Sequence, residues 1–148
     1  MSKDPSETAV LAWSRLVRAH DAALATVEQA SKAKGMPSLE WYDVLLELER
    51  GGPLRPRDLQ SRLLLAQYNL SRLLDRMVAP GLVERLVCED DRRGQLVAAT
   101  EEGRTLRRRM WPVYAGAIQE AVGARLSEAE AGALAELLRK LYPTGPNL

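Results

Sequence analysis

The chain has 148 residues, of which 46% are hydrophobic and 28% charged, with a formal net charge of +1. This composition argues against a disordered chain, and no hydrophobic run approaches the roughly 20 residues that cross a bilayer. The single cysteine cannot form an internal disulfide, and the single histidine argues against a zinc site or a His-based catalytic site. The N-terminus has no signal-peptide pattern. We therefore expect a cytoplasmic protein that is not an enzyme, needs no cofactor and has no membrane partner.

Positive charge is concentrated in the middle of the sequence. Residues 50–109 contain 13 Lys and Arg against 8 Asp and Glu, which leaves +5. Residues 1–49 contain 5 against 8, and residues 110–148 contain 3 against 4, so both flanks are acidic. A basic segment of this kind is typical of a surface that binds phosphates, although a solvated charged surface gives the same count.

A long amphipathic helix is predicted at the start of the chain. Asp4, Pro5 and Glu7 form a capping-box pattern, and hydrophobic residues then recur at helical spacing until Gly35. Such a helix is longer than a small core needs, so it either spans the molecule or packs on a second subunit. His20 lies on its hydrophobic stripe, where we expect a partly buried histidine rather than a ligand.

Two short helices follow, and capping and turn residues mark where they begin and end. Ser38 caps the first of them, and the sequence GGP at 51–53 ends it. Pro56 then opens the second, in the sequence RPRDLQSRLL.

A fourth helix is predicted from Gln67 to Ala79. Its hydrophobic positions are Leu70, Leu73, Leu74 and Met77. The opposite side carries amide, hydroxyl and guanidinium groups, which suit the base edges and phosphates of a DNA major groove. An ordinary solvated face is the alternative. Together with the preceding short helix, this segment has the pattern of a helix-turn-helix.

A β-hairpin is predicted directly after Pro80 and Gly81. The β-type residues at 82–87 and 96–97 flank a polar tip, in which Arg92 and Arg93 can enter a minor groove. Cys88, at the base of this hairpin, is a candidate redox sensor, but its acidic neighbours disfavour a reactive thiolate.

Two C-terminal helices complete the predicted order α-α-α-α-β-β-α-α, a mainly helical fold with a small β-wing. Thr100 caps the first of them, which runs to about Val122, and Ser127 with Glu130 forms a capping box for the last. The first carries four arginines, which either contact phosphate or pair with acids.

With these motifs in this order, the chain resembles the MarR family of winged-helix transcriptional regulators. The resemblance covers roughly residues 10–142 and rests on LRPRDLQSRL, LSRLLDR, GLVER, DDRRG and T-EEGR. It implies a single MarR-like domain, 1–148, that forms a homodimer. Residues 1–37 and 101–148 would be the helical dimerisation region, and 38–100 the winged helix-turn-helix DNA-binding region.

The resemblance also implies a function, that of a repressor that binds double-stranded DNA at an inverted repeat. The residues expected to contact DNA are Arg57, Gln67, Tyr68, Asn69, Ser71, Arg72, Arg76, Arg92 and Arg93. Residues 66–69 (AQYN) depart from the small or hydroxyl residues usual in the family. A helical protein–protein interaction module that has lost specific operator binding is therefore the alternative.

More narrowly, EWYDVLLELER and VCEDDRRG are similar to the branch that contains PecS and other urate-responsive regulators. That similarity implies an effector site for a purine such as urate, or for a phenolic anion, formed by Trp13, Asp43, Arg72 and Arg85. Two guanidiniums can bind an anion, an aromatic ring can stack on it, and a carboxylate can accept its N–H. Purely structural roles for the same side chains are the alternative.

Overall fold

The structure is a computed structural model that describes residues 3–65, 69–87 and 94–142. It confirms the predicted order of helices and strands, with a single π-helical turn added before the last helix. The elements are α1 (Glu7–Ala33), α2 (Leu39–Gly51), α3 (Pro56–Arg62), α4 (Leu70–Val78), β1 (Val83–Val87), β2 (Gln95–Ala99), α5 (Glu101–Ile118), η1 (Gln119–Gly123) and α6 (Glu128–Arg139).

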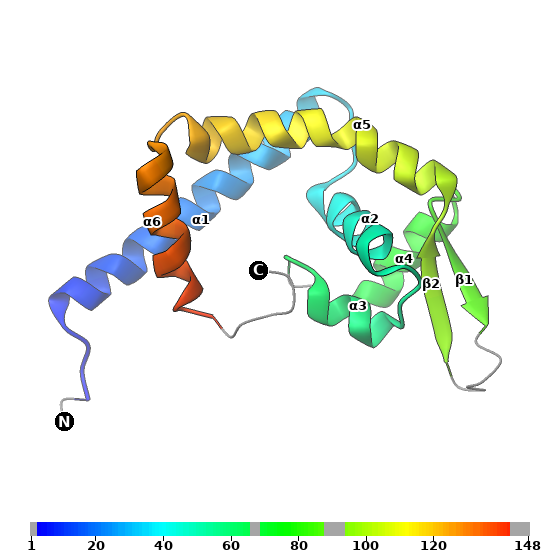
Figure 1. Cartoon of the computed structure of the whole chain (residues 1–148), viewed down its shortest axis with the longest axis horizontal. Helices are drawn as coiled ribbons and strands as arrows, with labels where there is room; N and C mark the ends of the chain where they lie inside the picture. Colours follow the sequence, from blue (N-terminus) through cyan, green and yellow to red (C-terminus); the bar gives the residue numbers. More distant parts are fainter. Residues whose placement is uncertain (1–2, 66–68, 88–93, 143–148) are drawn as a thin grey trace.

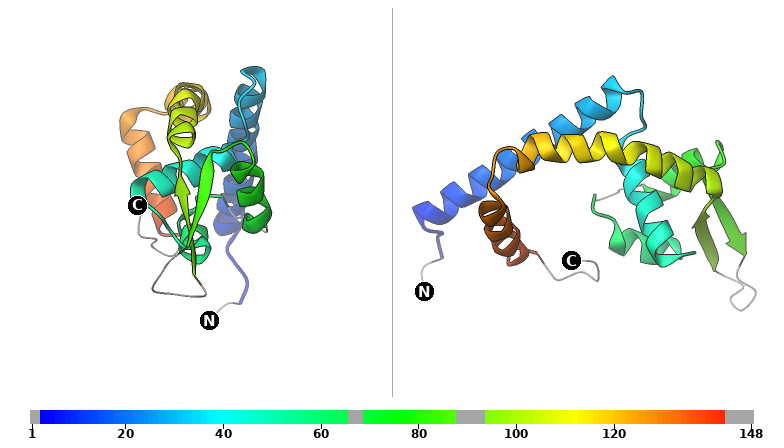
Figure 2. Two further views of the ribbon diagram at one scale, coloured as in Figure 1. Left: turned by 90° about the vertical axis from the view of Figure 1, so that its right-hand side faces the viewer. Right: turned by 45° about the horizontal axis from the view of Figure 1, so that its top comes forward.

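The molecule is elongated, with different elements at its two ends (Figure 1). Helices α2, α3 and α4 and the two strands form a compact winged unit at one end. Helix α6 and the N-terminal half of α1 lie at the other, and α5 runs between the ends (Figures 1 and 2). The predicted helix-turn-helix and wing are thus one structural unit.

The wing is a two-stranded antiparallel sheet that the rest of the unit holds at its base. Its register runs from the pair Val83 and Ala99 to the pair Val87 and Gln95. Leu54, in the loop before α3, adds two backbone hydrogen bonds to Val97, of 3.0 and 2.8 Å. The β2 strand is therefore paired on both edges near its centre.

The core of the winged unit forms around α4. Leu70, Leu73, Leu74 and Met77 are all buried, as their helical spacing predicted. They pack in one cluster with buried residues of α2, α3 and the strands, which include Val44, Leu45, Leu48, Leu59, Val83 and Val97.

Two predicted helix starts are wrong. The N-cap of α1 is Ser6 rather than Asp4, because the Ser6 hydroxyl accepts a hydrogen bond of 3.1 Å from the Ala9 N–H. Helix α4 starts later than Gln67: Asn69 has a non-helical backbone, and its side chain accepts from the Arg72 N–H. The predicted caps at Thr100 and Ser127 are confirmed.

Helix α1 does not span the core of its own chain. Among its 27 residues, Val27 and Ser31, both near the C-terminal end, are buried. His20 is exposed and lies 3.3 Å from Asp21, so the expectation of a partly buried histidine is wrong within one chain. The prediction failed because residues 7–20 of the helix are exposed within one chain, apart from Ser14 and Leu16, which are partly buried.

Gly103, in the first turn of α5, permits the closest packing between α5 and the winged unit. A Cβ at this position would lie 2.1 Å from the Leu82 carbonyl oxygen and 2.9 Å from Leu45 Cδ2. Backbone cannot move aside as a flexible side chain can. The first turn of α5 is therefore fitted to the end of the helix-turn-helix.

We predict that Gly103→Ala lowers the free energy of unfolding by at least about 2 kcal/mol, because the added methyl overpacks this contact. Gly116→Ala is the matched control in the same helix, where a Cβ meets nothing within 4 Å. The control should raise stability by up to about 1 kcal/mol through helix propensity. Urea unfolding followed by circular dichroism measures both, and equal effects of the two substitutions would contradict the packing argument.

Candidate nucleic-acid interface

One side of α4 is left exposed by the packing of the other. Because the four hydrophobic residues are buried, Ser71, Arg72 and Arg76 lie on the outer side together with Asp75. An exposed helix face with hydroxyl and guanidinium groups, beside a β-hairpin, has the geometry of a recognition helix. The structure thus brings Ser71, Arg72 and Arg76 together on one surface, as predicted.

Three exposed arginines of the helix-turn-helix form no ion pair with a described carboxylate. Arg57, at the start of α3, and Arg72 and Arg76 on α4 have no carboxylate partner among the described residues. Asp75, the acid nearest to them along α4, is held by Arg85 of β1 at 2.5 Å. Phosphates therefore face three positive charges with no internal ion pair to break.

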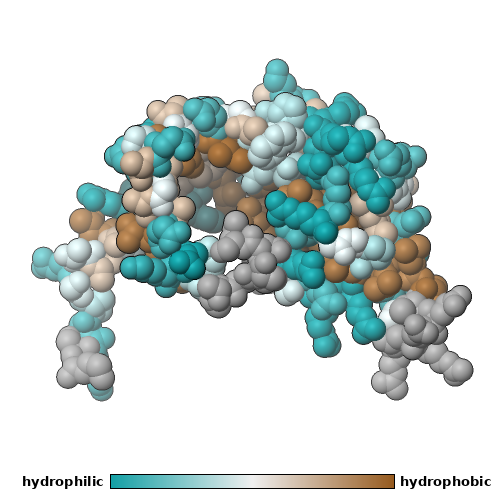
Figure 3. Space-filling model, in the orientation of Figure 1, coloured by the Kyte–Doolittle hydropathy of each residue, from teal (hydrophilic) through white to brown (hydrophobic). Residues whose placement is uncertain are grey.

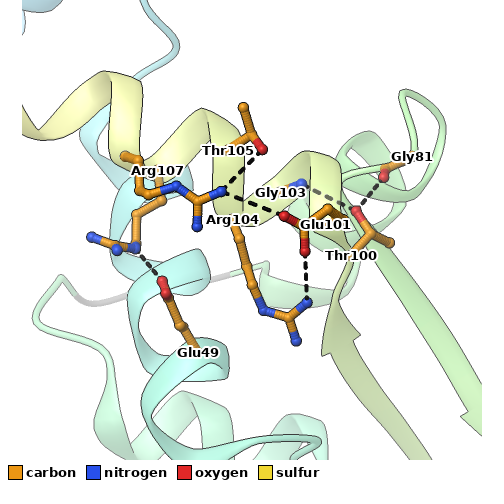
Figure 4. Close-up of polar contacts among 9 residues, drawn as sticks. Glu49, Gly81, Thr100, Glu101, Gly103, Arg104, Thr105 and Arg107 are labelled. Atoms are coloured by element: carbon orange, nitrogen blue, oxygen red, sulfur yellow. Dashed lines mark hydrogen bonds and ion pairs between the residues drawn. The ribbon is translucent and has the colours of Figure 1, made fainter.

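The arginines of α5 differ in this respect. Arg104 and Arg108 both lie near Glu101, at 3.7 and 3.5 Å, and Arg107 forms an ion pair with Glu49 of α2 (Figure 4). The sequence left open whether this cluster binds phosphate or pairs with acids. For these three residues the structure shows acid pairing.

The N-terminal end of α4 carries a second polar group. Asn69 Oδ1 accepts the Arg72 N–H at 3.4 Å, which leaves the Asn69 amide N–H groups facing solvent as donors. The predicted contacts of Gln67, Tyr68, Arg92 and Arg93, and the role of Cys88, lie outside the described residues. Those assignments stay predictions.

Asp43 has a structural partner that the sequence did not reveal. Its side chain is 6% exposed, and Oδ2 accepts a 2.9 Å hydrogen bond from the backbone N–H of Leu65, just before α4. Burial raises the pKa of this carboxyl, while the N–H groups of Leu65 and Leu64 act in the opposite direction. Burial, with the charge of Asp43 as a smaller cause, also raises the pKa of Tyr114. Asp43 thus ties α2 to the turn of the helix-turn-helix.

The four predicted effector residues do not converge within one chain. Trp13 is 67% exposed and lies in the N-terminal half of α1, at the opposite end of the molecule from β1 and Arg85 (Figures 1 and 2). Arg85 is bound to Asp75, and Asp43 to a backbone N–H. A site that uses all four residues needs Trp13 from a second copy.

Sequence reasoning missed Asp75 and Glu49 as partners of Arg85 and Arg107. Acidic residues at these positions carry no periodic signal that separates them from a solvated face.

Across the described residues, no group of three or more His, Cys, Asp or Glu is placed to hold a metal. A search of the same residues finds no helix with the length and hydrophobicity to span a membrane.

Known proteins match this chain in both sequence and fold. A model of the MarR family matches residues 34–94. The multiple antibiotic resistance protein MarR of Escherichia coli (strain K12) is 29% identical over 102 residues, which are 69% of this chain and 71% of that protein.

Two solved structures show the same fold over most of the chain. Sco3205, a MarR family transcriptional regulator from Streptomyces coelicolor solved in complex with DNA, has a TM-score of 0.84 and 24% identity. The match covers 95% of this chain and 89% of that one. BpsR of Bordetella bronchiseptica, whose DNA binding is regulated by 6-hydroxynicotinic acid, has a TM-score of 0.76 and 27% identity. That match covers 88% of this chain and 98% of that one.

Because Asp43 is buried, we predict that it makes the stability of the folded chain depend on pH. Its raised pKa means that the folded chain binds more protons at this site than the unfolded chain. The contribution of Asp43 to the free energy of unfolding therefore falls as pH rises above 3.8, the ordinary pKa of an Asp side chain. Asp43→Asn keeps an acceptor for the Leu65 N–H and removes this proton linkage. The stability of Asp43→Asn minus that of wild type should thus increase from about pH 4 to about pH 7 in urea unfolding.

Asp43→Ala separates the hydrogen bond from the charge. It leaves the Leu65 N–H without its acceptor, so it should lose about 1–3 kcal/mol near pH 7. An Asn-minus-wild-type difference that stays constant or falls as pH rises would contradict the proposed cost of burying the charge.

Proposed function

Taking the chain as a winged-helix regulator of the MarR family, which both the family model and the fold support, we propose that it represses transcription by binding an inverted-repeat operator as a homodimer. The observation that carries this proposal is the set of exposed, unpaired arginines on the helix-turn-helix: Arg57, Arg72 and Arg76.

The DNA face combines two kinds of contact. Helix α4 enters the major groove, where Ser71, Arg72 and Arg76 are positioned to reach bases or phosphates. Arg57 at the start of α3 contacts the phosphate backbone. The wing arginines, Arg92 and Arg93, are assigned to the flanking minor groove on the sequence pattern alone.

The dimer forms through the end of the molecule that lies away from the wing. Hydrophobic side chains are exposed there on both α1 and α6, and some are visible on this end in Figure 3. They are Val10, Leu11, Trp13 and Val17 of α1, Leu134 and Leu137 of α6, and Leu141 and Tyr142 just after α6. A surface of this kind is covered in most stable proteins, and a second copy offers the same two helices. The two recognition helices would then lie one helical turn of DNA apart, roughly 34 Å.

A small anionic aromatic molecule, such as urate or a phenolic acid, is the proposed effector. Arg72 and Arg85 supply the positive charge beside the recognition helix, and Trp13 of a second copy supplies a stacking surface. BpsR, whose DNA binding is regulated by 6-hydroxynicotinic acid, supports this ligand class. Release of DNA requires the effector to bind more tightly to the DNA-incompetent spacing of the recognition helices.

A protein–protein interaction module is the second candidate function. The unusual sequence AQYN at residues 66–69, where base contacts concentrate in this fold, favours it. This module would bind all DNA sequences weakly and equally. A regulator should prefer its operator over unrelated DNA by a factor of roughly 10³ or more, which mobility-shift titrations with competitor DNA measure.

We predict that Arg72→Ala and Arg76→Ala each weaken binding to the DNA upstream of the chain's own gene. Each should also reduce the slope of log affinity against log salt by about 1, because each variant loses one phosphate-neutralising charge. Arg108→Ala removes the same charge from a residue that is paired with Glu101 and should leave the slope unchanged. Equal slopes for all three variants would refute the assignment of the α4 face.

The effector predicts a different pattern. The double variant Arg85→Gln, Asp75→Asn removes the guanidinium without leaving a free carboxylate on the α4 face, so it should keep operator binding. It should raise the concentration of urate or 6-hydroxynicotinate needed to release DNA by about tenfold or more. Asp75→Asn breaks the same ion pair without removing the guanidinium, so release should occur at the wild-type concentration or below. If neither anion releases wild-type protein from DNA, the effector class is wrong while the DNA assignment stands.

A further inference from the structure

The C-terminal end of α4 is closed by a tight turn that brings two carbonyl groups to the base of the wing. Gly81 has a φ of 79°, and the N–H groups of Gly81 and Leu82 bond back to Val78 and Met77 at 2.9 and 3.0 Å. This is the pattern of a Schellman motif, in which the glycine takes the left-handed conformation. The carbonyls of Gly81 and Leu82 then point away from the helix and need donors of their own.

Thr100 supplies both donors and also starts the next helix; Figure 4 shows its side-chain contacts with Gly81 and Gly103. Its hydroxyl donates to the Gly81 carbonyl at 2.5 Å, and its backbone N–H donates to the Leu82 carbonyl at 3.1 Å. The same hydroxyl oxygen accepts the Gly103 N–H at 3.1 Å as the N-cap of α5. A hydroxyl has one hydrogen and two lone pairs, so it can do both at once, whereas a carboxylate can only accept.

Neighbouring contacts also fix the first two turns of α5 against the winged unit. Gly103 sits against the Leu82 carbonyl with no room for a Cβ, and Arg107 forms its ion pair with Glu49 of α2. The end of the recognition helix, the base of the wing and the start of α5 therefore share one residue, Thr100. Sequence alone indicated its role as the cap of α5 and not its bond to Gly81.

We propose that Thr100 is a positioning residue for operator recognition, which fixes the orientation of α4 relative to α5 through its bond to Gly81. This inference rests on the proposed function, in which α5 leads from the winged unit to the end that meets a second copy. Two recognition helices must match two half-sites at a fixed spacing. A rotation of α4 relative to α5 in each copy would therefore displace both helices from the grooves. Contacts to phosphates alone tolerate such a displacement better than contacts to bases.

Three substitutions at Thr100 separate positioning from helix capping. Thr100→Ser keeps both hydrogen bonds, and Thr100→Asp keeps a good N-cap acceptor but cannot donate to the Gly81 carbonyl. Thr100→Ala removes both side-chain hydrogen bonds, to Gly81 and from Gly103, without adding a charge. Ser127→Asp is the matched control, because Ser127 caps α6 in the same way: its hydroxyl oxygen accepts the Glu130 N–H, a bond that an Asp carboxylate can also accept.

The measurement is a pair of affinities for each variant, one for operator DNA and one for unrelated DNA, with thermal unfolding followed on the same samples. Wild type, Thr100→Ser and Ser127→Asp should bind the operator alike. Thr100→Asp should bind it about tenfold or more weakly while its affinity for unrelated DNA changes by less than about threefold. If Thr100→Asp does not fold, Thr100→Ala is expected to show the same selective loss.

Each outcome bears on one of two claims. Operator binding by Thr100→Asp and Thr100→Ala that equals that of Thr100→Ser would overturn the positioning role and leave the regulator intact. An equal loss on operator and unrelated DNA would also overturn it, since that result indicates a general loss of the folded protein. Wild-type protein without preference for any operator would overturn the proposed function, and the positioning role with it.

Discussion

Burial of one side of α4 is the constraint on which the rest of the winged unit depends. Leu73, Leu74 and Met77 are at most 1% exposed, and each buried side chain of this size contributes about 1.5–3 kcal/mol of transfer free energy. A helix fixed in this way cannot rotate without exposing that surface. The opposite face must therefore point outward, and the arginines on it gain a fixed direction that no polar contact of their own supplies.

Charge on this protein is informative through its pairing rather than its total. The net charge of +1 says nothing about phosphate binding, yet the arginines of the helix-turn-helix differ from most of those on α5. Arg104, Arg107 and Arg108 of α5 are paired with Glu101 or Glu49, whereas Arg57, Arg72 and Arg76 have no acid partner among the described residues. An ion pair already formed has to be broken before a phosphate can use its arginine. The three unpaired arginines of the helix-turn-helix can therefore meet a phosphate without this cost.

Local features of the fold could be predicted from the sequence, and long-range pairs could not. The caps at Thr100 and Ser127 and the buried side of α4 follow from interactions within a few residues. The bonds between Asp43 and Leu65, and between Arg107 and Glu49, join residues 22 and 58 positions apart. Nothing in the periodicity of either segment selects these partners. The effector residues show the same limit, because Trp13 and Arg85 lie at opposite ends of one chain (Figure 1).

Helix α4 is held at both ends by helices from outside the helix-turn-helix. Asp43 of α2 binds the backbone just before α4, and Thr100, the cap of α5, binds the backbone just after it. Through Tyr42 and Met110, α2 and α5 also contribute to a hydrophobic cluster separate from the one around α4, which includes Val27 of α1. In the proposed dimer, a change in how α1 meets a second copy would reach α4 through these two polar contacts. The proposed ligand-controlled spacing of two recognition helices would therefore act on α4 through α2 and α5, the two helices that hold its ends.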